Sequence, residues 1–407
     1  MTYEAFAKRV CETGIITDPW LDGQPRFAQT PVVIEASTRD QLYEVAERIA
    51  SVYNELVGLV GDTPSFLDEF FGFTPTQKAM WASSVPSWHG IARADVFLTS
   101  EGPCIAELNC DTPTGQAEAV VLGELAGEGS PNGQLQARFV HMVEAIAAAE
   151  LKREPSGLCI GLVYPTELTE DLALVRLFRS WLEGRGHRVV LGSPYNLAFV
   201  KPRLQLFGVP VDVVVRHYKS DWWCERAPVW SNDSIPDAAP LIAPLAAILS
   251  AIAEGTVCVV NPMAAILTQN KRAMAFMWEH IHRFSPAAQA VIQAHIPFTA
   301  RMEVMHEAQL LTQKNEWVIK SDYGAEGDEV VVGRWVEEAD WRRAVSLAKP
   351  RRFVAQRFFD ATPVSNGEIV NYGVFLIGGK AAGIYLRTQL GSTDTRAKSV
   401  GIVVRSS

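Results

Sequence analysis

The sequence predicts a mixed α/β protein of the α+β kind, built from three successive regions. The chain has 407 residues, of which 48% are hydrophobic, enough for a large core and for more than one structural unit. Strands and helices alternate over residues 155–260, whereas strands separated by glycine-containing turns dominate from residue 261 onward. We therefore expect regions at 1–154, 155–260 and 261–407.

The first region is predicted to hold two long helices and one hairpin. Residues 39–60 and 133–152 carry apolar side chains at helical spacing. Between them, "RADVFLTSEGPCIAELNC" (93–110) has the composition of two short strands joined by a turn. The region thus combines helices with a small piece of sheet.

The second and third regions differ in pattern. In the second, a buried-strand run at 157–164 is followed by a helix over 168–186 and a strand over 187–192, which indicates a small three-layer α/β subdomain. The third begins with one helix, "NPMAAILTQNKRAMAFMWEHIHRF" (261–284), and continues as strands. Gly378-Gly379 in "FLIGGKAAG" indicates a hairpin among them.

Composition excludes several classes of protein. The formal net charge of −9 and the lack of a Lys/Arg run disfavour binding to nucleic acid. The most apolar stretch is interrupted by Pro244, Glu254 and Pro262, so we expect no membrane span, and the acidic N-terminus does not resemble a secretory signal. Six scattered cysteines, Cys104 and Cys110 among them, indicate reduced thiols and a cytoplasmic protein.

The predicted hairpin concentrates charge on one face. If residues 100–102 form a three-residue loop, Asp95 lies opposite Glu107 and Arg93 lies opposite Asn109. Two facing carboxylates repel unless a positive group lies between them, and that group could be Arg93 or a divalent ion. Carboxylate and amide oxygens suit Mg²⁺. The alternative is a solvated hairpin with a charged outer face.

Two lysines occur where a phosphate could be bound. Lys320 ends a strand and is followed by Gly324 and Gly327, and a glycine loop lets backbone N–H groups approach phosphate oxygens. Lys271 lies near the start of a helix. The alternatives are an ordinary glycine-containing hairpin turn and a surface lysine on an amphipathic helix.

Two further polar residues lie in apolar strands of the third region. Gln356 interrupts the strand "FVAQRFF", and Arg387 closes the strand "AAGIYLR". An arginine at the end of a buried strand either clamps an anion or extends into solvent.

Five of these blocks together resemble the synthetase part of the glutathionylspermidine synthase family, which comprises circularly permuted ATP-grasp ligases. The family patterns G-R-M-D-F and E-Y-N-A-D-T-P-T resemble "ARADVF" and "ELNCDTPTG". The pattern L-S-N-K resembles "LTQNK", V-x-K-P-x-Y-x-R-E-G-G-N-V resembles "VIKSDYGAEGDEV", and Y-Q-x-F and A-C-G-M-G-I-R resemble "AQRFF" and "AAGIYLR". A middle pattern, K-L-Y-P-L-E-W, is faintly similar to "RHYKSDW" (216–222). The order is the same over residues 90–390.

The resemblance implies an ATP-grasp-like catalytic region and a role for each matching residue. The implied Mg²⁺ ligands are Asp95, Glu107 and Asn109. The implied residues near the transferred phosphoryl group are Arg93 and Arg387. The implied ATP-binding set is drawn from the third region: Lys271, Lys320, Gly324, Gly327 and Gln356. The loop at 321–329, which contains Gly324 and Gly327, is expected to close over ATP.

The implied activity is an ATP- and Mg²⁺-dependent carboxylate–amine ligase whose substrates are small molecules or peptides. The chain departs from the family at Ala325, Ser321, Thr388, Gln389 and Leu108, and these departures affect substrate positions more than ATP positions. They make glutathione and spermidine doubtful substrates. Two alternative functions are a nucleotide-binding protein without ligase activity and a kinase-like phosphotransferase. The oligomeric state is not predicted.

Overall fold

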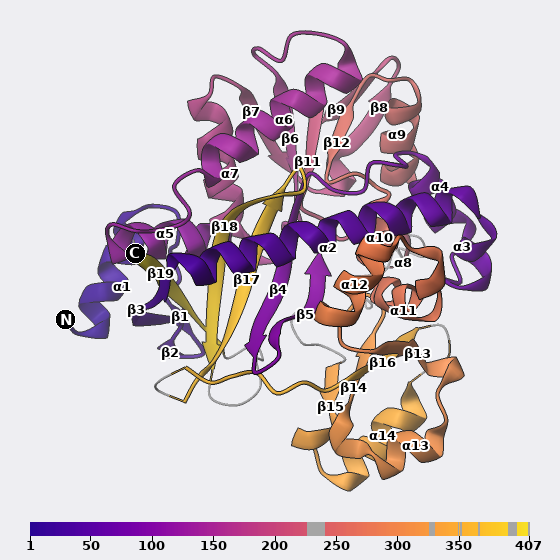
Figure 1. Cartoon of the computed structure of the whole chain (residues 1–407). Coiled ribbons are helices and arrows are strands. Elements are labelled where there is room, and N and C mark those ends of the chain that lie inside the picture. Colours follow the sequence, from indigo (N-terminus) through magenta and orange to yellow (C-terminus); the bar gives the residue numbers. More distant parts are fainter. Residues whose placement is uncertain are drawn as a thin grey trace, which may run out of the picture.

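The structure is a computed structural model of the chain. It describes residues 1–225, 241–324, 330–348, 350, 352–364, 367–389 and 397–405. The fold class predicted from the sequence, a mixed α/β protein, is confirmed (Figure 1).

A six-stranded sheet forms the centre and combines strands from both ends of the chain. Its order is β3-β19-β18-β17-β4-β5, and only the β3–β19 pair is parallel. The strands are β3 (Phe27–Glu35), β4 (Ile91–Thr99), β5 (Gly102–Asn109), β17 (Ile369–Ile377), β18 (Lys380–Gln389) and β19 (Lys398–Arg405). The sequence did not predict β3. Because β4 pairs with β17, the N-terminal hairpin is completed by strands more than 250 residues away.

Helices cover both faces of this sheet. The long helix α2 (Ala36–Asp62) crosses one face, and α5 (Gln116–Ala126) and α6 (Leu135–Leu151) cover the other (Figure 1). The helices predicted at 39–60 and 133–152 are therefore α2 and α6. Side chains that alternate along β4 separate the faces, since Ala92, Ala94 and Val96 pack in the core below α2.

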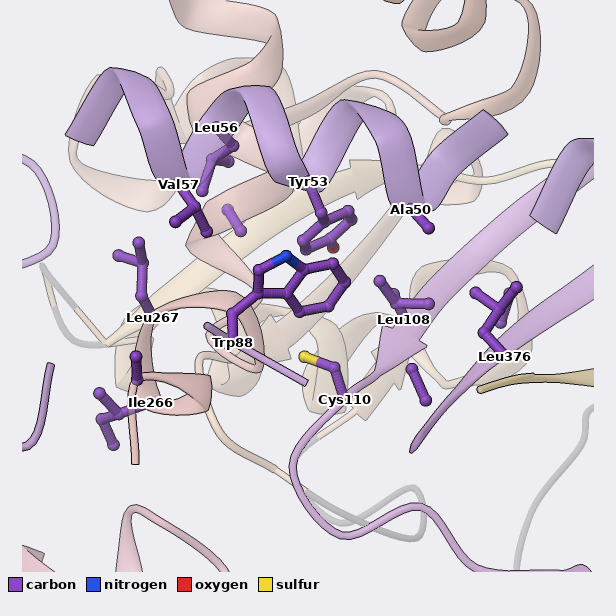
Figure 2. Close-up of a cluster of buried hydrophobic side chains, with 14 of the residues drawn as sticks. Ala50, Tyr53, Leu56, Val57, Trp88, Leu108, Cys110, Ile266, Leu267 and Leu376 are labelled. Atoms are coloured by element: carbon purple, nitrogen blue, oxygen red, sulfur yellow. The ribbon is translucent and has the colours of Figure 1, made fainter. Parts of the chain in front are cut away.

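The core below α2 also holds the end of β5. Tyr53 of α2 stacks on Trp88, with ring centroids 5.6 Å apart, and Leu108 and Cys110 pack beside them (Figure 2). The indole N–H of Trp88 donates to Asn54 Oδ1 at 2.7 Å. This packing fixes the strand that carries Glu107 and Asn109.

A parallel four-stranded sheet forms the α/β unit predicted over 155–260. Its order is β12-β11-β6-β7, with β6 (Cys159–Val163), β7 (Arg188–Gly192), β11 (Val213–Arg216) and β12 (Cys258–Val260). One face packs against α6 and α7 (Leu172–Gly184). The other packs against α9 (Ile242–Ala253) and a small sheet of β8 (Leu197–Val200), β9 (Arg203–Leu206) and β10 (Val209–Pro210). The sequence did not predict β8.

A third sheet forms a separate unit beyond the edge strand β5 (Figure 1). Its order is β13-β16-β14-β15, with β13 (Thr299–Arg301), β14 (Trp317–Ser321), β15 (Val330–Val332) and β16 (Phe353–Arg357). With α13 (Glu307–Thr312) and α14 (Glu338–Leu347) it has its own small core around Trp317 and Trp341. We call β13–β16 with α13 and α14 the outer unit.

The remaining helices connect these units. The prediction of a single helix over 261–284 is wrong. The structure has two helices there, α10 (Ala265–Thr268) and α11 (Arg272–Glu279), because the chain turns at 269–271. The other elements are α1 (Tyr3–Glu12), β1 (Trp20–Leu21), β2 (Gln24–Pro25), α3 (Ser65–Glu69), α4 (Pro75–Ala82), α8 (Trp222–Glu225) and α12 (Pro286–His295). Among the described residues, no helix combines the length and apolarity needed to cross a membrane.

Candidate active site

The predicted pairing of the charged hairpin is confirmed. Asp95 of β4 is the register partner of Glu107 of β5, and Arg93 is the partner of Asn109. These side chains lie on the face of the sheet opposite α2, because Ala94 and its alternate neighbours fill the α2 side. The hairpin therefore presents its four polar residues together.

The hairpin reaches this register by a route that the sequence did not predict. Thr99 pairs with Gly102, so the loop has two residues rather than three, and Gly102 takes a φ of 117°. The pairing then shifts by one residue at a β-bulge, which leaves Ala106 without a partner between Ile105 and Glu107. The bulge corrects the register that the shorter loop would otherwise impose.

Asp95 is held by cations rather than left facing a second carboxylate. It is 2% exposed, and Arg93 contacts both of its oxygens, with Nε–Oδ1 2.6 Å and Nη2–Oδ2 3.1 Å. From β18, Arg387 Nη2 approaches Oδ2 at 3.2 Å, and from β17 Asn371 Nδ2 donates to the same oxygen at 3.3 Å. Arg93, one of the two charge-compensating groups considered for the hairpin, therefore lies directly on Asp95.

Arg93 is fixed by the backbone around it. Burial by itself would lower the pKa of its guanidinium, but Asp95 raises that pKa above its usual value, so the group stays charged. Its Nη1 donates to the carbonyl oxygen of Thr114 at 2.8 Å. On β17, Gly373 leaves room for its stem, since a Cβ atom there would lie 2.8 Å from Arg93 Cδ.

Replacing Gly373 by alanine is therefore expected to displace Arg93 from Asp95. Overpacking of this kind costs about 1–3 kcal/mol of folding free energy, and a misplaced site residue costs roughly 10²-fold in turnover. Thermal unfolding measures the first effect, and turnover of ATP, the substrate that the family resemblance implies, measures the second. Gly58→Ala is the matched control, because a Cβ at Gly58 of α2 has no neighbour within 4 Å. Equal behaviour of the two variants would contradict the expectation.

Glu107 lies where the hairpin meets the third region. Lys271 Nζ is 3.6 Å from Glu107 Oε2, and Asn109 Nδ2 donates to Oε1 at 3.1 Å. Burial by itself would raise the pKa of Glu107, but the charges of Lys271 and Lys320 and the Asn109 hydrogen bond hold it at about 2. Glu107 is therefore ionised at neutral pH.

Lys320 reaches the hairpin from β14 of the outer unit. Its Nζ donates to Gln356 Oε1 at 2.7 Å and to the carbonyl oxygen of Ala106 at 3.3 Å. The β-bulge at Ala106 thus leaves a carbonyl oxygen available to the lysine. Burial lowers the pKa of Lys320 to about 8, against the attraction of Glu107.

Lys271 and the start of the glycine loop also meet. Lys271 precedes α11, and its Nζ donates to the carbonyl oxygen of Gly324 at 2.6 Å. Gly327 lies outside the described residues, as does most of the 321–329 loop, whose closure over ATP stays a prediction. The described site residues are brought into one place from the central sheet, from the sheet of the outer unit and its loop, and from the segment before α11: Arg93, Asp95, Glu107, Asn109, Lys271, Lys320, Gly324, Gln356 and Arg387.

Several polar residues at this place were missed by sequence reasoning. Asn371 supports Asp95, and buried Asp111 pairs with Arg216. Asp221 is 8% exposed, and its Oδ1 has no hydrogen-bond partner among the described residues. Burial raises its pKa to about 6, although Lys219 Nζ lies 3.4 Å away. The available signal was the faint match over 216–222, which contains Arg216 and Asp221.

The donor chemistry of the hairpin fits a magnesium ion. Glu107 is anionic, and Asn109 adds an amide oxygen two residues away on the same face. Asp95 already accepts hydrogen bonds, but from the described residues its Oδ1 accepts one, from Arg93 Nε, which leaves lone pairs for a metal. Among the described residues no group of three His, Cys, Asp or Glu forms a metal cluster, so Mg²⁺ here would depend on the amide and on substrate oxygens.

One family model matches the later part of the chain. Residues 234–405 match the family model described as glutathionylspermidine synthase preATP-grasp. The match confirms the resemblance over this part of the chain, and it includes the segments of Lys271, Lys320, Gln356 and Arg387. No curated protein matches the sequence.

Two solved structures are similar to the chain. A protein from Methylobacillus flagellatus KT with the provisional name gamma-glutamylcysteine synthetase has 13% identity and a TM-score of 0.51, covering 91% of this chain and 89% of that one. This likeness shows a shared fold. A RimK domain ATP-grasp protein from Sphaerobacter thermophilus DSM 20745 has 18% identity and a TM-score of 0.31, covering 60% of this chain and 89% of that one.

Proposed function

From the glutathionylspermidine synthase-like character of residues 234–405, we propose that the chain is an ATP- and Mg²⁺-dependent carboxylate–amine ligase. The observation that carries the proposal is the meeting of Glu107 and Asn109 with Lys271 and Lys320. A carboxylate and an amide oxygen beside two lysines make the arrangement that a metal–triphosphate needs, with cations for the phosphates and oxygen ligands for Mg²⁺. A protein that binds nucleotide alone does not require the two additional arginines at Asp95, buried Arg93 and partly exposed Arg387.

The site residues have complementary roles in this proposal. Lys271 and Lys320 hold the ATP phosphates, with the loop that starts at Gly324 and includes Gly327 closing over them. Gln356, which orients Lys320, lies on the nucleotide side. Asp95, Glu107 and Asn109 hold Mg²⁺, which when bound neutralises phosphate oxygens. We assign Arg93 and Arg387 to the reacting phosphoryl group.

The reaction that follows is amide synthesis in two steps. A substrate carboxylate oxygen attacks the γ-phosphorus of ATP, the bond to the β-phosphate oxygen breaks, and an acyl phosphate and ADP form. The amine then attacks the acyl carbon, and phosphate leaves with the loss of a proton from nitrogen. Arg93 and Arg387 stabilise the charge that spreads over the transferred oxygens. We place the amine near Asp221, whose Oδ1 has no hydrogen-bond partner among the described residues.

The substrates are proposed only by class, as a small-molecule or peptide carboxylate and an amine. Thr388, one of the departures from the family pattern, is buried beside Arg387 on β18. We therefore expect a C–N bond to form, but not efficient formation of glutathionylspermidine. Ala325, the departure in the loop, lies outside the described residues.

The proposal is tested by ADP release against panels of carboxylates and amines, with mass analysis of the product. The expected result is ADP formation that requires both partners, and a product whose mass is their sum less one water. ADP formation without an amine, together with a stable phosphate ester, would indicate a kinase-like enzyme. Tight ATP binding without turnover on any pair would indicate a nucleotide-binding protein. Efficient conversion of glutathione with spermidine would contradict the expectation about substrates.

The affinity for MgATP is expected to fall at alkaline pH. Lys320 with a pKa of about 8 is mostly charged at pH 7 and mostly neutral at pH 9. Above that pKa, Lys320 must therefore take up a proton from solvent when the phosphates bind. The dissociation constant should rise by roughly tenfold per pH unit above pH 8, until the pKa of the bound state is reached. Calorimetric titration with MgATP between pH 7 and pH 9.5 measures this.

The matched variant for this pH series is Lys320→Arg. An arginine stays charged throughout the range, so its dissociation constant should change little with pH, whatever its value at pH 7. A wild-type profile as flat as that of Lys320→Arg would contradict a role for Lys320 at the phosphates.

A further inference from the structure

The strand that carries the proposed metal ligands leaves the sheet directly after Asn109. Its next two residues, Cys110 and Asp111, therefore have backbone groups without strand partners. Side chains from a distant segment satisfy these groups. Gln269 Oε1 accepts from the N–H groups of Cys110 at 2.9 Å and Asp111 at 3.1 Å. Asn261 Nδ2 donates to the carbonyl oxygens of the same residues, at 3.0 and 2.9 Å.

The segment that carries Gln269 also carries Lys271, one of the two lysines assigned to the ATP phosphates. Gln269 lies two residues before Lys271, whose backbone N–H donates to the carbonyl oxygen of Asp322 at 2.8 Å. Thr268, the residue before Gln269, accepts a hydrogen bond from Cys110 Sγ at 3.1 Å. Residues 268–271, which we call the junction segment, thus contact the end of β5 on one side and the end of β14 on the other.

We infer that Gln269 is a positioning residue that sets the distance between the metal ligands of β5 and Lys271. This inference rests on the proposed function. Gln269 lies two residues from Lys271, and the groups it binds follow Asn109 directly, so a change in its hydrogen bonds moves these two parts of the site relative to one another. Both parts must act on one metal–triphosphate. Gln269 itself binds backbone N–H groups and needs no contact with the substrate.

The quantity that reports this role is the ratio of ATP dissociation constants without and with Mg²⁺. Without the metal, ATP can bind through the lysines alone. The gain in ATP affinity on adding Mg²⁺ requires the metal ligands of β5 to lie at the right distance from Lys271. Gln269→Met keeps the shape of the side chain and removes its acceptor. We expect the ratio to fall by about tenfold. This is the lower end of the loss in metal affinity that follows mutation of residues that hold metal ligands in place.

Three further variants separate positioning from a general loss of structure. Gln269→Glu keeps the acceptor oxygen and should restore the ratio to at least its wild-type value, because its added charge repels free ATP more than the less negative MgATP. Gln289→Met, which removes a side-chain bond to the carbonyl oxygen of Phe284 and touches no proposed site residue's hydrogen bonds, should leave the ratio unchanged. In a Glu107→Gln background, Gln269→Met should have little further effect on the ratio.

Isothermal titration calorimetry of ATP with and without Mg²⁺ gives these ratios, and thermal unfolding of each variant checks the fold. A wild-type ratio in Gln269→Met would overturn the positioning role, as would an equal loss of affinity in both conditions. If the wild-type chain itself gains no ATP affinity from Mg²⁺, the proposed function fails and this inference fails with it. The two failures are therefore distinguishable.

Discussion

Replacing Glu107 by glutamine is expected to reduce turnover by at least 10²–10³-fold while the chain stays folded. The glutamine side chain has the same size, but it lacks the charge that Mg²⁺ and the lysines require, and losses of this size follow removal of one electrostatic contact to a transition state. The expected signature is a lower kcat together with a higher requirement for Mg²⁺. Steady-state ADP release at several Mg²⁺ concentrations measures both.

The effect of this substitution on stability differs from what the sequence indicated. Two facing carboxylates would gain stability from the loss of one charge, but in the structure Asp95 is paired with Arg93 while Glu107 is paired with Lys271. The pKa of Glu107, about 2, is below its unfolded value, so its contribution to stability is present at neutral pH and is lost as the pH falls through about 4.5 to 2. Glu107→Gln should therefore be less stable at pH 7, by about 1–3 kcal/mol.

An acid titration distinguishes the loss of a contact from a loss of fold. The difference in unfolding free energy between wild type and Glu107→Gln should shrink as the pH is lowered, because the wild-type carboxylate is then neutralised as well. Full turnover in Glu107→Gln would contradict the metal assignment, whereas an unfolded variant at pH 7 would contradict the local nature of the pairing.

The local sequence pattern was sufficient to predict the hairpin of β4 and β5, but it did not predict the distant strands and side chains that complete the site. The alternation along 93–109 gave the facing pairs of Asp95 and Glu107, since side chains of a strand have a period of two. The two-residue loop and the bulge at Ala106 cancel in their effect on register, so the pairing was right although the loop length was wrong. Nothing local in the sequence distinguishes that combination from a three-residue loop.

The parts contributed by distant segments were accessible only through the family resemblance. Lys271, Lys320 and Arg387 each have an ordinary local reading, and only their order along the chain, compared with the family, placed them at one site. Gln269 was not predicted, because its role depends on two backbone N–H groups 158 and 159 residues away. A side chain that binds distant backbone has no periodic pattern that could reveal it.

Replacing Arg216 by methionine is expected to cost about 3–5 kcal/mol of folding free energy, the effect of removing one partner from a buried ion pair. Arg216 Nη2 contacts Asp111 Oδ1, and the two side chains are 0% and 1% exposed. The same guanidinium donates to the carbonyl oxygens of Tyr218 at 2.5 Å and Asn261 at 3.1 Å. Methionine fills much of the volume but leaves Asp111 as an uncompensated charge in the interior.

Two comparisons show whether burial is the cause of this cost. Arg179→Met removes an exposed pair with Glu183, one turn along α7, and should cost less than about 1 kcal/mol. Adding Asp111→Asn to Arg216→Met removes the stranded charge, so the double variant should be more stable than Arg216→Met alone, with a coupling of about 1–3 kcal/mol. Urea denaturation followed by tryptophan fluorescence gives the unfolding free energies of these variants and of Asp111→Asn alone, which completes the cycle. If Arg216→Met costs no more than Arg179→Met, the ion pair does not stabilise the connection between the α/β unit and the hairpin; if it costs several kcal/mol more, this pair joins the end of β11 to the segment that follows the metal ligands.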